Sequence, residues 1–179
     1  MSPLRLAIGL YGLLGVAGAA WMLLRGDHRT QVLLGADWKA SVLVGLGFAA
    51  AVLLVSDLLL ERFAWTRLLR REVQVAFSPL TPNVAVVLAV LSGVGEEVFF
   101  RGALQPSVGW VAASLAFGLL HTSFDRQLLG WTIFATIVGF GLGGLFQMTG
   151  GLLAPTLAHV VINGVQLARL ATTRRDRVD

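Results

Sequence analysis

The amino-acid sequence predicts an all-α protein, a polytopic bundle of about six membrane helices plus one amphipathic helix at the membrane surface. The first observation is composition: 56% of the 179 residues are hydrophobic and 13% are charged, with a mean hydropathy of +0.77. Soluble domains carry about 25% charged residues. The second observation is that the apolar residues form long segments, so we expect one integral membrane domain over residues 1–179.

Two apolar segments near the start, residues 3–24 and 40–60, are each long enough to cross a bilayer. An alternative interpretation of the first is a signal peptide, because GVAGAA resembles a small-residue cleavage region. Its apolar run exceeds the roughly 7 to 15 residues of a signal peptide, which favours a retained span. Residues 61–77 place apolar side chains among arginines, a pattern typical of an amphipathic helix on the membrane surface. These apolar side chains are Phe63, Leu68, Leu69 and Val73.

The second half of the chain is predicted to form two helical hairpins. The segment Pro106–Gly109 carries a turn signal between the helices of the first hairpin. In the second hairpin Gly139 and Gly143 are four residues apart, which predicts a face where helices pack closely. The expected helices are residues 80–105, 111–121, 131–148 and 153–170.

Basic residues are divided unequally between the two sides of the predicted bundle. With a cytoplasmic N-terminus, that side collects Arg5, Arg62, Arg67, Arg70, Arg71, Arg126, Arg169, Arg174, Arg175 and Arg177. The other side receives Arg25, Arg29 and Lys39. This asymmetry predicts that both termini are cytoplasmic. It also explains the net charge of +4 without a nucleic-acid partner.

Two residue counts bear on the source organism and on the chemistry that the chain can perform. A single lysine beside thirteen arginines indicates a GC-rich bacterial source, so the predicted location is a bacterial plasma membrane. The chain has no cysteine, which excludes disulfides, thiolate metal ligands and cysteine nucleophiles.

The stretch GVGEEVFFRG, residues 93–102, places three charged side chains inside a predicted span. Each ionised group costs about 3 kcal/mol at mid-membrane, so all three must be paired, hydrated or neutralised. Glu97 and Arg101 are one helical turn apart and are expected to form an ion pair. Glu96 points about 100 degrees away and keeps its own environment, which suits a general base or acid.

Three further polar residues are predicted to lie near this stretch. Glu96 and His121 are equidistant from the turn at Pro106–Gly109, so an antiparallel pair of helices brings them to the same depth. His159 and Asn163 are four residues apart on one face of the last helix. We expect them at a comparable depth where the two hairpins pack together.

Each of these residues also has a purely structural interpretation. A lone histidine in a membrane helix often serves packing, and a lone asparagine often forms an interhelical hydrogen bond. The Glu97–Arg101 pair can specify packing. Convergence at one depth favours a functional site, because every structural interpretation would otherwise have to hold independently.

Three short motifs occur in the order in which the CPBP family of intramembrane proteases carries its signature motifs, and they resemble those motifs. They are E-E-x-x-x-R at Glu96, Glu97 and Arg101, F-x-x-x-H at Phe117 and His121, and H-x-x-x-N at His159 and Asn163. The family includes CAAX prenyl endopeptidases and bacterial abortive-infection or bacteriocin-processing proteins. The resemblance covers residues 90–165 and implies a catalytic core at about residues 80–170.

The resemblance implies hydrolysis of a membrane-associated peptide or protein within the lipid bilayer. The implied roles are polarisation of the attacking water by Glu96 and His121, hydrogen bonding to the oxyanion by His159 and Asn163, and alignment of the first helix by Glu97 and Arg101. The family is often described as a metalloprotease family, and Glu and His are acceptable zinc ligands. A glutamate-dependent mechanism without metal is also argued for it. The sequence does not require a divalent metal such as zinc, and leaves both mechanisms open.

Two alternatives come from other functional classes. A non-proteolytic immunity or scaffold protein of the same fold carries the same motifs. A proton-coupled carrier also uses buried Glu, Arg and His, but it is expected to show internal repeats and interrupted helices, and neither is clear in this sequence. Prenylated substrates are not expected in a bacterium, so we do not predict CAAX processing.

Overall fold

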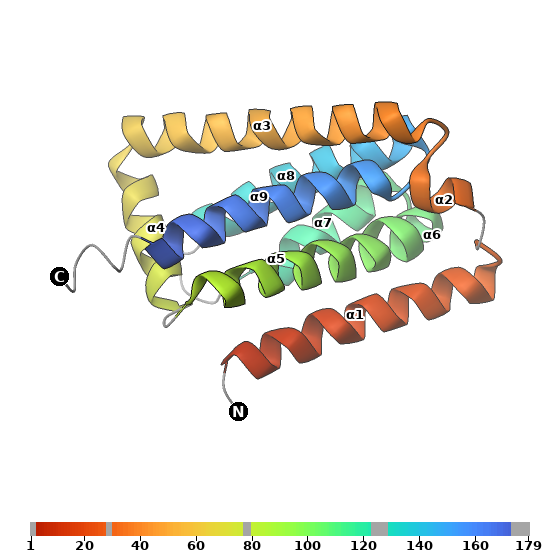
Figure 1. Ribbon diagram of the computed structural model, residues 1–179, viewed down its shortest axis with the longest axis horizontal. Coiled ribbons are helices and arrows are strands. Elements are labelled where there is room, and N and C mark those ends of the chain that lie inside the picture. The colour runs from red at the N-terminus through yellow and green to blue at the C-terminus, as the bar shows by residue number, and fades with distance from the viewer. Residues whose placement is uncertain (1–2, 28–29, 77–79, 123–128, 173–179) are drawn as a thin grey trace.

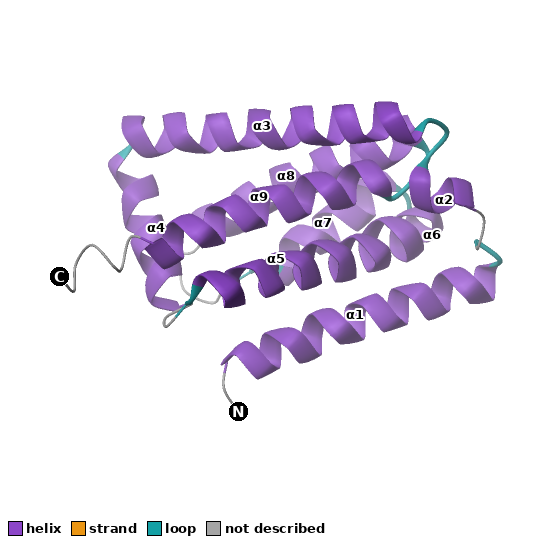
Figure 2. Cartoon of the chain, viewed as in Figure 1, coloured by secondary structure: helices purple, strands orange, loops and turns teal. Residues whose placement is uncertain are grey.

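The computed structural model describes residues 3–27, 30–76, 80–122 and 129–172. Within these ranges all regular structure is helical (Figure 2), which confirms the predicted all-α class. The helices are α1 (Pro3–Arg25), α2 (Thr30–Leu34), α3 (Trp38–Arg62), α4 (Ala64–Ala76), α5 (Pro82–Glu97), the π-helix η1 (Val98–Leu104), α6 (Gln105–Val108), α7 (Trp110–Leu120), α8 (Leu129–Thr149) and α9 (Leu153–Thr172).

The long helices lie side by side in a bundle (Figure 1). Helix α9 is central, because it packs against α3 on one side and α5 on the other. Helix α1 packs on the outer side of α5 and η1, while α7 and α8 pack together as the second layer. The core between α3, α8 and α9 is formed by small and aliphatic side chains, including Ala49, Leu142 and Ala158, all fully buried.

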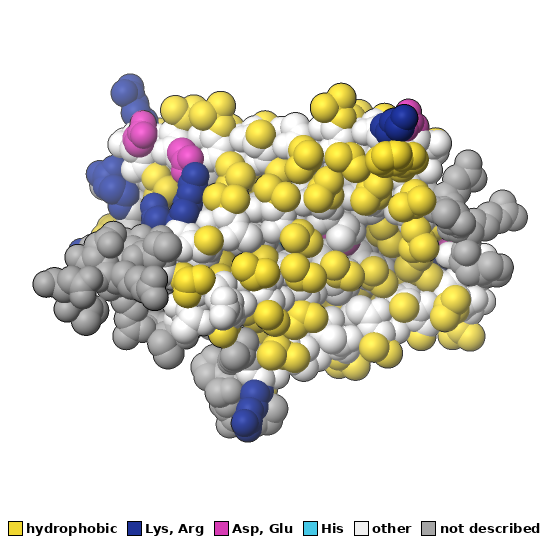
Figure 3. Space-filling model, in the orientation of Figure 1, with side chains coloured by type: hydrophobic (Ala, Val, Ile, Leu, Met, Phe, Trp, Pro, Cys, Tyr) yellow, Lys and Arg dark blue, Asp and Glu magenta, His cyan; other side chains and the backbone are white. Residues whose placement is uncertain are grey.

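Four helical segments of the described chain are long and apolar enough to cross a membrane. They are Arg5–Arg25, Val32–Arg62, Pro82–Val108 and Leu129–Thr149. Helix α7 is apolar but short, and α9 is 20 residues long and carries more polar side chains. Figure 3 shows the apolar side chains over the middle of the bundle, with Lys and Arg side chains near its ends. The chain is an integral membrane protein.

The first hairpin differs from the expected one in where its first helix ends. That helix continues through η1 and α6, so Pro106 is helical and the chain reverses at Gly109. Pro106 has no amide hydrogen to donate into the helix, and it lies just after the wide turn of η1, close to the point where the chain reverses. Gly109 has a φ of 88°, which glycine adopts without steric cost.

The predicted amphipathic segment forms α4, which runs across one end of the bundle (Figure 1). The helix does not simply turn its apolar side chains toward the bundle, because Thr66 is buried while Leu68 is 60% exposed. The side chains of Leu69 and Val73, also named in the prediction, lie outside the described residues. Whether α4 lies at the membrane surface stays a prediction.

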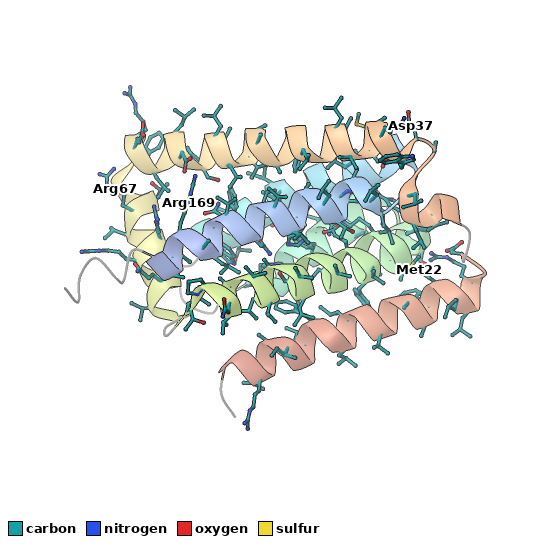
Figure 4. The ribbon with its side chains drawn as sticks, in the orientation of Figure 1. Met22, Asp37, Arg67 and Arg169 are labelled. Atoms are coloured by element: carbon teal, nitrogen blue, oxygen red, sulfur yellow. The ribbon has the colours of Figure 1, made fainter. Side chains whose placement is uncertain are left out.

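Helix α1 begins and α9 ends at the same end of the bundle, beside α4 (Figure 1). The labelled side chains of Arg67 and Arg169 lie at this end, and Asp37 lies at the opposite one (Figure 4). This arrangement agrees with the predicted side of each described basic residue. Arg29, Arg126, Arg174, Arg175 and Arg177 lie outside the described residues. The orientation in the membrane stays a prediction.

Candidate active site

The structure brings the six predicted site residues together from four consecutive or neighbouring elements. Glu96 and Glu97 form the last turn of α5, and Arg101 lies in η1. His121 ends α7, and α9 supplies His159 and Asn163. The packing of α5 against α9 and of η1 against α7 places these segments side by side.

Glu97 is the centre of a buried ionic cluster. Its Oε1 accepts hydrogen bonds from Nη1 of Arg101 at 3.1 Å and from Nδ1 of His159 at 2.8 Å. The side chains of Glu97 and Arg101 are 0% and 1% exposed. The predicted Glu97–Arg101 ion pair is therefore present, and the same carboxylate also holds His159 of α9.

Arg101 connects this cluster to the second layer of helices. Its Nη2 donates to the backbone carbonyl of Gly139 in α8 at 2.8 Å. The guanidinium carbon lies 4.4 Å from the ring centroid of Phe117, over the aromatic face. A Cβ atom at Gly139 would approach Cδ1 of Phe117 to 2.9 Å, so glycine is what allows α7 and α8 to approach this closely.

Glu96 faces a different partner, as its position on the helix predicts. Its Oε2 lies 3.6 Å from Nε2 of His121. Nδ1 of His121 lies 2.8 Å from the carbonyl oxygen of Phe117. A carbonyl can only accept, so Nδ1 carries the hydrogen and, in a neutral ring, Nε2 turns its lone pair toward Glu96. The separation exceeds a direct hydrogen bond and suits groups that act through a shared water molecule.

The two predicted oxyanion donors are already bonded to protein groups. Nδ1 of His159 is bonded to Glu97, so Nε2 carries a hydrogen only in the imidazolium form. Nδ2 of Asn163 donates to the hydroxyl of Ser92 at 2.9 Å. Because an amide nitrogen has two hydrogens, Asn163 keeps one donor for another acceptor.

A cavity of about 220 Å³ opens beside Glu96. Among the predicted site residues, Glu96, His121 and Asn163 contribute to its lining. The wall is largely apolar with a few polar groups, which is typical of ligand sites. The described residues that line it are Tyr11, Ser56, Leu59, Leu60, Thr66, Arg70, Leu88, Ser92, Glu96, His121, Gly130, Trp131, Phe134, Ile162, Asn163, Gln166, Leu167 and Leu170.

Tyr11 and Ser92 are cavity residues that the sequence reasoning did not identify. Tyr11, the only tyrosine of the chain, lies in an apolar segment with no motif. It reaches the cavity because Gly95 lets the backbone of Tyr11 lie directly against α5. Ser92 is one turn before Glu96, so its place on the inner face could have been found from helical spacing.

A metal site would need several His, Asp or Glu side chains that converge on one point. Among the described residues, no group of three or more His, Asp or Glu side chains is arranged to hold a metal ion. A catalytic zinc ion usually takes three protein ligands. Here Glu97 and His159 bond to each other, and the donor set does not fit such a site.

A buried carboxylate and a histidine beside a cavity in a helical membrane bundle form a candidate ligand-binding or active site. Residues 78–165 match the family model described as type II CAAX prenyl endopeptidase Rce1-like. The uncharacterized protein YpbD of Bacillus subtilis (strain 168) is 38% identical over 98 residues, which cover 52% of this chain and 50% of that protein. No solved structure matches the chain. Residues 78–165 therefore carry the CPBP-family relationship that the sequence motifs predicted.

Proposed function

We propose that the protein is an intramembrane endopeptidase that hydrolyses a membrane-associated peptide or protein with water activated between Glu96 and His121. The single observation that carries this proposal is the buried Glu96 carboxylate facing Nε2 of His121 at the wall of a cavity. The family match supports a membrane endopeptidase in general. We further propose the bacterial plasma membrane as its location, with both termini cytoplasmic and residues 80–170 as the catalytic core.

In the proposed reaction, Glu96 accepts a proton as the water oxygen attacks the scissile carbonyl, and later returns that proton to the leaving amine. The lone pair of Nε2 on His121 orients the water by accepting its other hydrogen. The second amide hydrogen of Asn163 is available to the developing oxyanion. Glu97 and Arg101 position His159 rather than touch the substrate. The steps of this proposed reaction use side chains of the protein itself, and none is routed through a metal.

The proposal is tested by comparing the membrane proteomes of cells that produce the wild-type protein, Glu96→Gln or Glu61→Gln. Glu61 is an exposed carboxylate in the last turn of α3 and serves as the matched control. We expect a cleavage product in wild-type and Glu61→Gln cells that is absent with Glu96→Gln, at equal amounts of inserted protein.

Two further assays, of a host phenotype and of transport in proteoliposomes, separate the rival functions. A host phenotype that persists with Glu96→Gln would favour a non-proteolytic binding or immunity role. Transport of a solute into proteoliposomes, with no cleavage product in the wild-type or the Glu96→Gln sample, would favour a carrier.

A further inference from the structure

The inner face of α4 is polar. Thr66, Arg70 and Gln74 are spaced four residues apart on one side of this helix and are buried or half-buried. Leu68 and Val75, on another side, are 60% and 72% exposed. Helix α4 therefore turns polar groups toward the bundle, although such groups are costly to bury unless they find partners.

Two of these three polar side chains have partners. The hydroxyl of Thr66 donates to the carbonyl of Leu59 at 2.8 Å, and the amide of Gln74 donates to the carbonyl of Leu170 at 3.5 Å. Arg70 forms no ion pair or hydrogen bond within the described part of the chain. It instead lines the cavity that also contains Glu96.

Among the described residues, Asp57 does not supply an anion for Arg70. Asp57 is already paired with Arg169, at 2.5 Å and 3.1 Å between their oxygen and nitrogen atoms. Figure 3 shows Lys and Arg side chains together with Asp and Glu side chains at the end of the bundle where α4 lies. A guanidinium without a partner among the described residues, at the wall of a low-dielectric cavity, attracts ligands of the opposite charge.

We propose that Arg70 binds a carboxylate of the substrate, so that the cavity selects peptides with an acidic group near the bond to be cleaved. This inference rests on the proposed function, because it assumes that one occupant reaches from Arg70 to Glu96. The planar guanidinium can hold a carboxylate through two parallel hydrogen bonds. Gln166, which also lines the cavity, offers a further amide donor. The carboxylate is either the C-terminus of the peptide or an Asp or Glu side chain.

The test measures binding, so that it does not depend on turnover. The full chain carrying Glu96→Gln is placed in nanodiscs of phosphatidylcholine. The probes are three fluorescent, N-palmitoylated decapeptides. The first has a free C-terminal carboxylate, the second is the carboxamide of the same sequence, and the third is that carboxamide with one internal residue replaced by glutamate. We expect one acidic probe to bind about 10-fold more tightly than the plain carboxamide. The probe that gains affinity identifies the source of the carboxylate.

Variants at α4 locate the effect. We expect Arg70→Gln to abolish the preference for the acidic probe, and Arg70→Lys to retain part of it as the folded, charge-preserving variant. Arg71→Gln is the matched control, because Arg71 is exposed and does not line the cavity. It is expected to keep the full preference.

Three outcomes overturn the inference. The first is equal affinity for the acidic and neutral probes, and the second is an equal loss of the acidic preference in Arg71→Gln. The third is stabilisation by phosphatidylglycerol that depends on Arg70, without selectivity for acidic peptides, which would assign Arg70 to a lipid headgroup. Cleavage of both probe types by the wild-type protein, without selectivity, refutes the carboxylate site alone. Selective binding without any cleavage refutes the proteolysis and leaves the carboxylate site standing.

Discussion

Glu97 links three helices through a single carboxylate oxygen, which accepts from Arg101 in η1 and from His159 in α9. Both members of the Glu97–Arg101 pair are essentially inaccessible, so their charges depend on each other and on the carbonyl of Gly139. Removing one partner of a buried ion pair is costly because the other charge remains buried. The Asp57–Arg169 pair is different, since its side chains are 41% and 39% exposed.

Arg101→Met is expected to destabilise the protein by about 3 to 5 kcal/mol, because it leaves Glu97 charged and buried. The matched change, Arg169→Met, removes an exposed ion pair and is expected to cost less than about 1 kcal/mol. Thermal unfolding in detergent, followed by the loss of monodisperse protein, measures both. Equal losses in the two variants would show that the buried cluster is not the stronger contact.

For single residues, the sequence predicted contacts between nearby positions better than contacts between distant ones. The Glu97–Arg101 pair follows from helical spacing alone, and the approach of Glu96 to His121 follows from the hairpin. The bond from Glu97 to His159 joins residues 62 positions apart and depends on how α5 packs against α9. The participation of Tyr11 likewise depends on tertiary packing.

Among the elements, α1 contributes to the site through its contact with α5 and η1. Gly18 of α1 is buried against the backbone of Val98 and Phe99, and a Cβ atom there would lie 2.7 to 2.9 Å from their atoms. Helix α1 therefore approaches η1 at the distance that glycine permits. This approach also carries Tyr11 to the cavity wall.

Gly18→Ala is expected to separate α1 from η1, at a cost of about 1 to 3 kcal/mol, because backbone atoms cannot move aside as a side chain can. We expect reduced proteolysis at temperatures where the protein remains folded, since η1 directly follows Glu96 and Glu97 and carries Arg101. Gly12→Ala on the same helix is the control, because its Cβ atom would meet no atom within 4 Å. A loss in Gly12→Ala equal to that in Gly18→Ala would contradict this account.

Two elements could not have been predicted in detail. In the wide turn of η1, Arg101 contacts α7 and α8, and these contacts have no local signal in the sequence. Such π-helical turns are rare and often occur at functional sites. The polar inner face of α4 also reverses the usual expectation, because its apolar Leu68 and Val75 point away from the bundle. The sequence pattern predicted an amphipathic helix there and did not determine which face turns inward.

In the whole molecule, the end that carries α4 is the more basic one. The positive-inside rule predicts that this end faces the cytoplasm and that Lys39, at the other end, faces outward. The spans were predictable because lipid requires long apolar helices. The number of spans was predicted less closely: about six were expected, whereas four segments of the described chain meet the length and hydropathy of a membrane helix. Helix α9 carries polar site residues that lower its hydropathy.

The orientation is tested with single cysteines, which are unique labels because the chain has none. We expect Lys39→Cys to react with a membrane-impermeant maleimide in intact cells. Arg71→Cys should react after the membrane is opened and not before. The reverse pattern would place both termini outside.

The central claim is that Glu96 and His121 act as one unit on one water molecule. The most direct measurement is the rate of cleavage of the substrate found by proteomics, in proteoliposomes, for Glu96→Gln, His121→Ala and the double variant. We predict that each single variant loses about a hundredfold or more, and that the double variant is no slower than the slower single variant. Undiminished cleavage by Glu96→Gln, or losses that multiply in the double variant, would contradict the account.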